Sequence, residues 1–283
     1  RIKDGYGINA QIIEKAAADG IALIITCDNG IAAFEAMEYA HQMGIDVIIT
    51  DHHEVFKEEG KDRLPLAKAI INPKQADCHY PFDGICGAVV AWKLVELFYR
   101  FFDVSYEEWK LLLSVAAIAT VGDVMQLKDE NRIIVRYGLR ALEKTKNLGL
   151  RALLQVCELE NKELTAYHIG FIIGPCLNAS GRLKTAKLAL ELLMSKDMET
   201  AKQRAMELKR LNDERKDMTQ QGVDQAIKIV EAAPEEKVLV VYLSDCHESL
   251  AGIIAGRLRE RYQRPAIVLT DAQEEGILKG SGR

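Results

Sequence analysis

Apolar positions follow two different periods in the first part of the chain. Apolar residues at helical spacing predict helices over 8–20 and 31–43. Between and after them stand short continuous apolar runs rich in β-branched residues, at 21–26, 46–50 and 69–71. Such runs are typical of strands that are buried on both faces of a parallel sheet. Strand, helix and strand in this order predict a βαβ unit with helices packed on the sheet.

The middle of the chain is mainly helical in pattern. Apolar residues at helical spacing, separated by short polar turns, predict helices over 86–101, 106–120 and 131–145. Residues 184–232 predict helix again. Within them, the stretch from about 196 to 222 is dense in charges of alternating sign, which favours a solvated helix between two domains.

A second α/β pattern follows Pro234. Residues 237–243 and 266–270 predict strands, and residues 249–262 between them predict a helix. We therefore expect an α/β fold, in which a parallel-sheet domain with a helical segment is joined by a long helix to a smaller α/β domain. The expected bounds are 1–195 for the first domain, 196–233 for the connecting helix and 234–283 for the second domain.

The composition is that of an ordinary globular protein. Of the 283 residues, 48% are hydrophobic and 28% charged, enough for one large core or two smaller ones. The net charge of −5 gives no overall basic field, but metal ions and a few arginines can hold phosphates without one. Six scattered cysteines without a CxxC pair favour reduced thiols. Without a signal peptide or a membrane-length apolar stretch, we expect a cytoplasmic protein. We also expect a monomer.

Candidate metal ligands follow two of the predicted strands. Asp28 comes after the first strand, and Asp51, His52 and His53 come directly after the second. Because ligands bind at the carboxyl ends of parallel strands, we expect these side chains to face one crevice. A single aspartate after a strand is often a helix N-cap, but two adjacent histidines have no packing reason to stand there. Carboxylate and imidazole together are ligands for Mn²⁺, Zn²⁺ or Fe²⁺.

Asp123 is a third candidate, delivered by a helix end. It follows Gly122, which permits a sharp turn after the apolar helix. Taken alone, Gly-Asp is more often a turn than a ligand. Beside the other two segments, we interpret Asp123 as a ligand.

Isolated aromatic and imidazole residues favour structural roles. Trp92 and Trp109 lie on helical faces, which favours the core over a stacking surface for bases. His41, His79 and His168 favour surface or structural positions.

Three segments in order resemble motifs of the DHH phosphoesterase superfamily. They are Cys27–Gly30, Ile48–His53 and Ala119–Asp123. The opening Lys3–Gly7 and the segment Gly174–Arg182 are similar to the single-strand DNA exonuclease branch of that superfamily. His247–Arg257, together with Lys279–Arg283, looks like the DHHA1 domain that follows in such proteins. The resemblance covers essentially the whole chain.

The resemblance implies a role for each candidate at the metal site. Asp28 bridges two divalent metals, and His52 and Asp123 complete one of them. Asp51 supports the site from behind, and His53 lies near the scissile phosphate, so these two are the catalytic candidates beside the ligands. The expected cofactors are two Mn²⁺ or Mg²⁺ ions, which suit phosphodiester hydrolysis.

Gly174–Arg182 has two interpretations. By itself it is a Gly-Pro turn with a solvated arginine, yet glycines also let a backbone approach phosphate, Asn178 can donate an amide and Arg182 offers a bidentate fork. The resemblance implies a loop, including Gly181, that reads the 5′ end of a single strand. The tail is likewise a flexible linker by composition, and by resemblance a phosphate-contacting loop that includes Ser281 and Arg283. His247, which opens a loop before a helix, belongs to the same expected set of phosphate contacts.

The chain departs from the superfamily at its start. The first motif, an Asp-x-Asp after the first strand, is absent, and Asp4 belongs to the segment that normally follows it. We expect a preceding strand with that motif to be missing, and the second domain to be cut short after Arg283. The polypeptide as given is therefore expected to bind metal weakly and to hydrolyse DNA poorly.

Three functions are open at this point. The first is a metal-dependent 5′→3′ exonuclease on single-stranded DNA, in recombination and repair, with a single-strand-binding protein and a helicase as candidate partners. The second keeps the site but acts on short oligonucleotides or 3′-phosphoadenosine 5′-phosphate, against which Asn178, Arg182 and the long helix argue. The third is a catalytically silent module of a replication complex, against which the retained candidate ligands argue.

Overall fold

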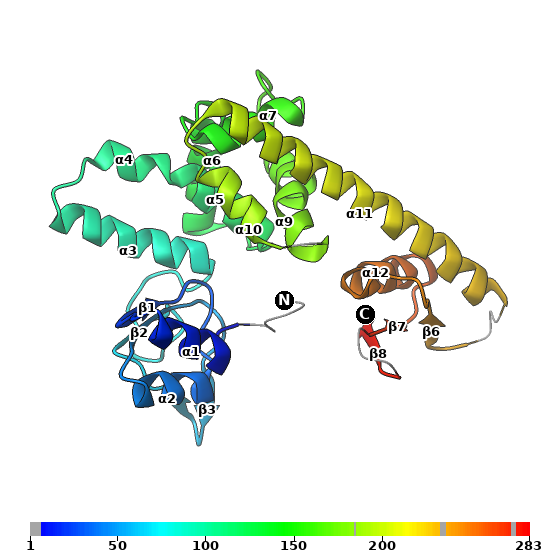
Figure 1. Cartoon of the computed structure of the whole chain (residues 1–283), viewed down its shortest axis with the longest axis horizontal. Coiled ribbons are helices and arrows are strands. Elements are labelled where there is room, and N and C mark those ends of the chain that lie inside the picture. The colour runs from blue at the N-terminus through cyan, green and yellow to red at the C-terminus, as the bar shows by residue number, and fades with distance from the viewer. Residues whose placement is uncertain (1–6, 184, 233–235, 273–275) are drawn as a thin grey trace. The chain divides into compact units, whose positions relative to one another are not determined.

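The structure is a computed structural model that describes residues 7–183, 185–232, 236–272 and 276–283 (Figure 1). The chain forms two compact units, Arg1–Gly174 and Pro175–Arg283, which we call the first and the second unit. Both mix helices with a sheet that contains parallel strands, so the predicted α/β class is confirmed. None of the described helices has the length and apolar character needed to span a membrane.

The first unit is built on a parallel sheet of three strands. They are β1 (Leu23–Ile25), β2 (Asp46–Thr50) and β5 (Ala69–Ile71), in the order β1-β2-β5. Ile25 pairs with Ile48, and Thr50 pairs with Ile71. All three strands therefore run in the same direction and end at the same edge, as the sequence predicts.

Two helices cover one face of this sheet. They are α1 (Ala10–Ala18) and α2 (Phe34–Gln42), and their apolar faces form a core with β2 through Ile13, Met37 and Ile49. The prediction that the first strand is buried on both faces is wrong. Leu23 and Ile25 are 47% and 48% exposed, because β1 pairs only with β2 among the described strands and the helices cover its other face.

A hairpin that the sequence did not predict stands beside the sheet. Its strands are β3 (Phe56–Glu58) and β4 (Lys61–Arg63), which pair antiparallel. Glu59 and Gly60 between them both have positive φ, the geometry of a two-residue hairpin turn.

The rest of the first unit is helical. The helices are α3 (Gly87–Phe101), α4 (Tyr106–Leu111), α5 (Leu113–Gly122), α6 (Asp129–Glu143), α7 (Leu148–Val156) and α8 (Ala166–His168). The helix predicted over 106–120 is divided between α4 and α5. Trp92 and Trp109 are 8% and 7% exposed and stack at 4.2 Å, which confirms that they belong to the core.

The segment after α8 is one continuous helix, not a loop. The π-helix η1 (Ile169–Ile173) leads into α9 (Gly174–Leu183), so the prediction of a phosphate-binding loop over 174–182 is wrong. Glycine next to proline indicated a turn, because proline inside a helix has no N–H to donate and crowds the carbonyl four residues earlier. The wider π-helical turn before Pro175 accommodates that carbonyl.

The second unit joins helices to a small mixed sheet. After α9 its elements are α10 (Lys187–Leu193), α11 (Met198–Ala232), β6 (Leu239–Tyr242), η2 (Glu248–Leu250), α12 (Ala251–Tyr262), β7 (Ala266–Asp271) and β8 (Leu278–Gly282). The strands lie in the order β6-β7-β8, with β6 and β7 parallel and β8 antiparallel. The last residues are thus a strand, and the predicted loop around Ser281 is wrong, because β8 pairs with β7 along its whole length.

The long helix α11 carries alternating charges, as predicted. Lys209 pairs with Asp213 and Arg210 with Glu214, each four residues apart. Between Asn212 and Gly222 none of its residues is buried. The middle of α11 is therefore a solvated stretch, which satisfies one part of the sequence interpretation. Its role as a connector between domains stays a prediction.

Candidate metal centre

The ends of β1 and β2 bring the acidic residues to one edge of the sheet. The backbone N–H of Asp28 donates to Thr50 O at 2.9 Å, and that of Asp51 donates to Ile71 O at 3.0 Å. Asp28 has φ +61°, and Gly30 has φ +119° in a space bounded by Thr26 and the Ile49 side chain. A side chain at Gly30 would be strained, so this glycine lets the chain turn tightly below Asp28.

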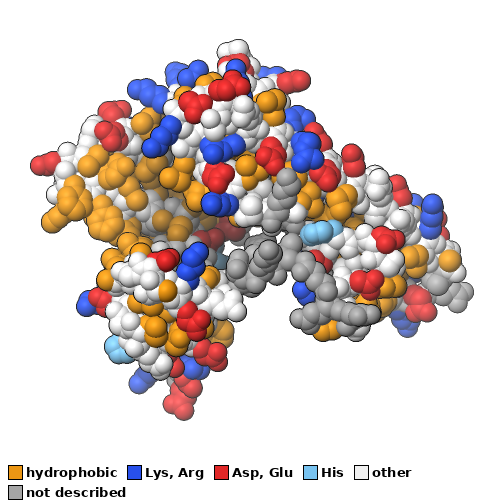
Figure 2. All heavy atoms as spheres, viewed as in Figure 1, with side chains coloured by type: hydrophobic (Ala, Val, Ile, Leu, Met, Phe, Trp, Pro, Cys, Tyr) orange, Lys and Arg blue, Asp and Glu red, His pale blue; other side chains and the backbone are white. Residues whose placement is uncertain are grey.

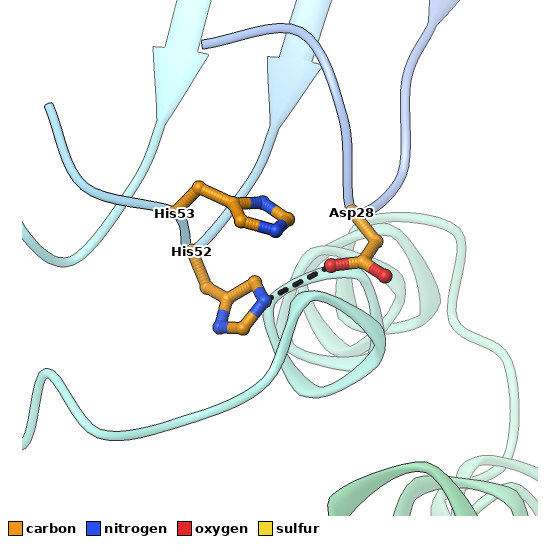
Figure 3. Close-up of side chains that lie close together, drawn as sticks. All are labelled: Asp28, His52 and His53. Atoms are coloured by element: carbon orange, nitrogen blue, oxygen red, sulfur yellow. Dashed lines mark ion pairs between the residues drawn. The ribbon is translucent and has the colours of Figure 1, made fainter. Parts of the chain in front are cut away.

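His52 is the meeting point of three segments. Its Nε2 lies 3.0 Å from Asp28 Oδ1 (Figure 3) and 3.4 Å from Asp123 Oδ2. Asp123 is the residue at the C-terminal end of α5, whereas the other two follow strands. The structure thus brings together the three residues that the sequence singled out as metal ligands.

The charges of these three residues do not balance. The hydrogen bond to Asp28 raises the pKa of His52, against the opposing effect of burial. Burial raises the pKa of Asp123, and the nearby Asp28 carboxylate raises it further, although His52 opposes both. One imidazole is therefore shared by two carboxylates, whose side chains are 51% and 46% exposed. A cation placed between them would relieve this repulsion.

Asp51 has a different environment. It is 1% exposed, its Oδ2 accepts the Ile31 N–H at 3.0 Å, and its Oδ1 accepts the His52 N–H at 2.8 Å. The same Oδ1 lies 2.7 Å from His53 Nδ1. Burial opposes the charge, but these hydrogen bonds outweigh it and lower the pKa of Asp51. This carboxylate is thus held by backbone N–H groups and by the His53 ring, an environment that favours a supporting role over metal ligation.

His53 is positioned by Asp51 and faces outward. Its side chain is 58% exposed, and Nδ1 is engaged by the carboxylate, which leaves Nε2 for chemistry. The ligand atoms of Asp28, His52 and His53 all lie within 4.8 Å of one another. Asn72 donates its amide to the His53 carbonyl at 3.0 Å and so fixes the backbone.

Gly87 is a site residue that the sequence did not reveal. It is the first residue of α3, and a Cβ there would lie 2.5 Å from Asp28 Oδ1 and 2.6 Å from Asp28 Cα. Only glycine lets the start of α3 approach Asp28 so closely. Its signal in the sequence is faint, because a glycine between Cys86 and Ala88 at a helix start has no distinctive pattern.

The donor set fits a divalent metal ion. Two carboxylates and one imidazole from separate segments are the ligand types of Mn²⁺ and related ions. Of these three residues Asp28 also lines a hollow of about 770 Å³, together with Asp51 and His53. The buried Nδ1 of His52 has no hydrogen-bond partner among the described residues.

The predicted phosphate contacts lie in the second unit. Asn178 is exposed on α9, Gly181 lies against Ala186, and the side chain of Arg182 is outside the described residues. His247 caps η2 and its Nδ1 lies 2.7 Å from Ser249 Oγ.

At the end of the chain, Arg283 Nη1 donates to Ser281 Oγ at 3.1 Å. Gly252 on α12 lies against both, since a Cβ there would be 3.0 Å from Ser281 Oγ and 3.1 Å from Arg283 Nη2. The polar end of β8 and the start of α12 are therefore neighbours.

The sequence was compared with known protein families. Residues 4–122 match the DHH family, N-terminal domain. This part of the chain therefore belongs to the DHH family, as its motifs indicate.

The relatives that match the whole chain belong to one branch of that family. This chain is 41% identical to the single-stranded-DNA-specific exonuclease RecJ of Bacillus subtilis (strain 168) and 36% identical to that of Escherichia coli (strain K12). Both alignments cover 100% of this chain, but only 35% and 51% of the relatives. The resemblance to the exonuclease branch is confirmed, and the chain spans about a third to a half of these relatives.

Solved structures agree with this assignment. An exonuclease RecJ bound to manganese superposes with a TM-score of 0.83 at 27% identity, covering 95% of this chain and 66% of that one. RecJ from Thermus thermophilus in complex with Mn²⁺ has a TM-score of 0.78 at 27% identity, covering 93% and 38%. The predicted fold is therefore confirmed.

Proposed function

We propose that the chain is the catalytic part of a metal-dependent 5′→3′ exonuclease that hydrolyses phosphodiester bonds of single-stranded DNA. The observation that carries this proposal is the convergence of Asp28 and Asp123 on His52, in a family whose similar members are single-stranded-DNA-specific exonucleases. Recombination and repair in the cytoplasm, beside a single-strand-binding protein and a helicase, belong to the same proposal. The expected domain bounds, with a DHHA1 domain over 234–283, belong to it as well.

Asp28, His52 and Asp123 would hold the metal ion. Asp28 is the half-exposed carboxylate nearest His52, and it can share its second oxygen with a second ion, as the family resemblance implies. Mn²⁺ or Mg²⁺ suits this oxygen-rich set, and the matched structures contain manganese. When bound, such ions supply positive charge for the phosphoryl oxygens and an activated water.

Asp51 and His53 would act on the substrate side. The buried carboxylate would accept a hydrogen bond from Nδ1–H of His53 and so favour the tautomer whose Nε2 is free, beside the hollow in which the phosphate would lie. His53 can then hold or donate a proton at Nε2. This arrangement favours a proton-transfer role for His53 over metal ligation.

Asn178, Gly181, Arg182, His247, Ser281 and Arg283 are the proposed contacts to the phosphate backbone. Asn178 and Arg182 are four residues apart in the sequence of α9. Ser281 and Arg283 are hydrogen bonded at the end of the chain. Such contacts position a strand without reading its sequence, which suits an exonuclease without sequence preference.

The proposal is tested with end-labelled DNA and the protein at its natural length. We expect Mn²⁺-dependent release of mononucleotides from the 5′ end of a long single strand, and little from a duplex. A dinucleotide or 3′-phosphoadenosine 5′-phosphate hydrolysed faster than the long strand would instead support the short-substrate alternative. Lack of hydrolysis of every substrate, together with normal folding and Mn²⁺ binding, would contradict the proposal.

A further inference from the structure

Two exposed aromatic rings form an ordered surface in the first unit. Tyr167 on α8 and Phe171 on η1 are 62% and 66% exposed, although rings of this size are usually at least half covered. Their centroids are 4.8 Å apart and their planes differ by 26°, so the rings are stacked. A stacked pair presents a flat apolar face, which a single exposed ring on a flexible side chain does not.

The backbone beneath these rings is held firmly. Ile169 and Ile173 flank Phe171 and are 0% and 1% exposed. The N–H of Gly174 donates to Ile169 O, the bond of a π-helical turn. Upstream, His168 Nδ1 accepts the Thr165 N–H at 3.0 Å and caps the helix. The rings are therefore preorganised, and π-helical turns are frequent at functional sites.

The pair also lies next to the helix that delivers a metal-site residue. A Cβ at Gly170, between the two rings in sequence, would be 3.6 Å from Val121 Cγ1. Val121 is two residues before Asp123, near the end of α5. The residue after Asp123, Val124, is 88% exposed. The helical turn that carries the aromatic pair thus packs on α5 one turn or less before Asp123, within one unit.

We propose that the Tyr167–Phe171 pair is a stacking platform for an unpaired base of the strand whose phosphate lies at the metal centre. This inference rests on the proposed function, because it presumes a nucleic-acid substrate. Bases stack on aromatic faces irrespective of their identity, and protein sites for single strands combine such faces with phosphate contacts. The platform would hold a nucleotide by its base, where the other proposed contacts hold it by its phosphates.

Two other aromatic pairs show what sets this one apart. Trp92 and Trp109 are also stacked, but they are buried and offer no face to a ligand. Phe101 and Phe102 at the end of α3 are 80% and 68% exposed, but their planes meet at 89°. Apolar side chains gather over α3 and α4 (Figure 2). The Phe101–Phe102 pair is therefore a matched control for nonspecific apolar binding.

The test compares two fluorescent single strands in EDTA, so that nothing is hydrolysed. One is an oligothymidylate, and the other is an abasic strand of the same length with the same phosphates. We expect the wild-type protein to bind the oligothymidylate more tightly. Phe171→Leu, which keeps an apolar side chain, should weaken binding of the oligothymidylate about tenfold, a typical loss for one base stack, and leave the abasic strand unchanged.

Two further variants sharpen the test. Phe171→Trp restores a ring and should keep the preference for bases, whereas Phe101→Leu should bind both strands like the wild type. Equal binding of both strands by the wild type would overturn the inference while leaving the exonuclease proposal intact. So would an equal loss on both strands in Phe171→Leu. If the wild type binds neither strand in EDTA, the platform is overturned, and the exonuclease proposal is then decided by the Mn²⁺-dependent hydrolysis assay alone.

Discussion

Two acid–imidazole pairs lie at the same edge of the sheet, yet their environments differ. Asp51 and His53 form a buried carboxylate with a ring hydrogen bonded to it, and the pKa of Asp51 is lowered because its hydrogen-bond donors outweigh the cost of burial. Asp28 and His52 form a second pair, but His52 Nε2 also lies close to the carboxylate of Asp123. The first arrangement is complete in itself. In the second arrangement two carboxylates share one imidazole, so positive charge is lacking. This difference suggests which residues position the site and which ones bind an ion.

The largest effect on activity is expected from removing the carboxylate nearest His52. In Asp28→Ala we expect metal-dependent hydrolysis to fall below detection and Mn²⁺ affinity to drop strongly, because the shared ligand is lost. Calorimetric titration with Mn²⁺ measures the affinity, and release of labelled nucleotides measures the activity. Asp46→Ala is the control, since Asp46 lies at the other end of β2 and pairs with Lys68 on the surface. Activity in Asp28→Ala near that of the control would remove Asp28 from the proposed ligands.

Asp51→Asn tests the complete pair. We expect an about 100-fold loss in the rate of hydrolysis, at the upper end of the range for residues that orient a functional histidine, with a smaller change in Mn²⁺ affinity. The amide also places a donor among N–H groups, which should destabilise the fold by about 2 kcal/mol. Steady-state kinetics and chemical unfolding measure the two effects. A variant that loses Mn²⁺ affinity as completely as Asp28→Ala would show that Asp51 is a ligand.

Gly87→Ala tests the pair of Asp28 and His52 without removing a proposed ligand. The new methyl group must displace Asp28, so we expect about a tenfold weaker Mn²⁺ affinity, the lower end of the range for changes that disturb the orientation of a ligand. Gly256→Ala is the control. Nothing lies within 4 Å of a Cβ at Gly256 in α12, and alanine should stabilise that helix by about 0.5–1 kcal/mol. Unchanged Mn²⁺ binding in Gly87→Ala would mean that Asp28 is not held by α3.

The smallest expected effect is a pH dependence of stability in the metal-free protein. Because the pKa of Asp51 is lower in the folded state than its ordinary value of about 3.9, the unfolded chain binds more protons in acid. Its stabilisation is present above pH ~4 and is lost as the pH falls through the folded pKa. The difference in unfolding free energy between wild type and Asp51→Asn should therefore shrink from pH 7 towards pH 3. A difference that stays constant would mean that Asp51 is not ionised in the fold.

The sequence was sufficient to predict the chemistry at the strand ends. Asp28 and Asp51–His53 follow apolar runs, and parallel strands must end at one edge, so their meeting was predictable from pattern alone. Asp123 needed its neighbours as context, since it comes from a helix end.

Other features depend on contacts that no local pattern encodes. Gly87 matters only because α3 returns to touch Asp28, which is far away along the chain. The sequence predicts a loop over 174–182 where the structure has a helix, because the π-helical turn that offsets the effect of Pro175 leaves no local signal. The edge position of β1 depends on which strands pair, and strand pairing is long-range.

The central claim is that Asp28, His52 and Asp123 bind one ion together. A crystal soaked in Mn²⁺, measured at the manganese absorption edge, locates the metal by its anomalous scattering. The account predicts a peak within bonding distance of His52 Nε2 and of carboxylate oxygens from both aspartates, lost in a His52→Gln crystal. A peak elsewhere in the first unit, with these three side chains turned away from it, would contradict the account.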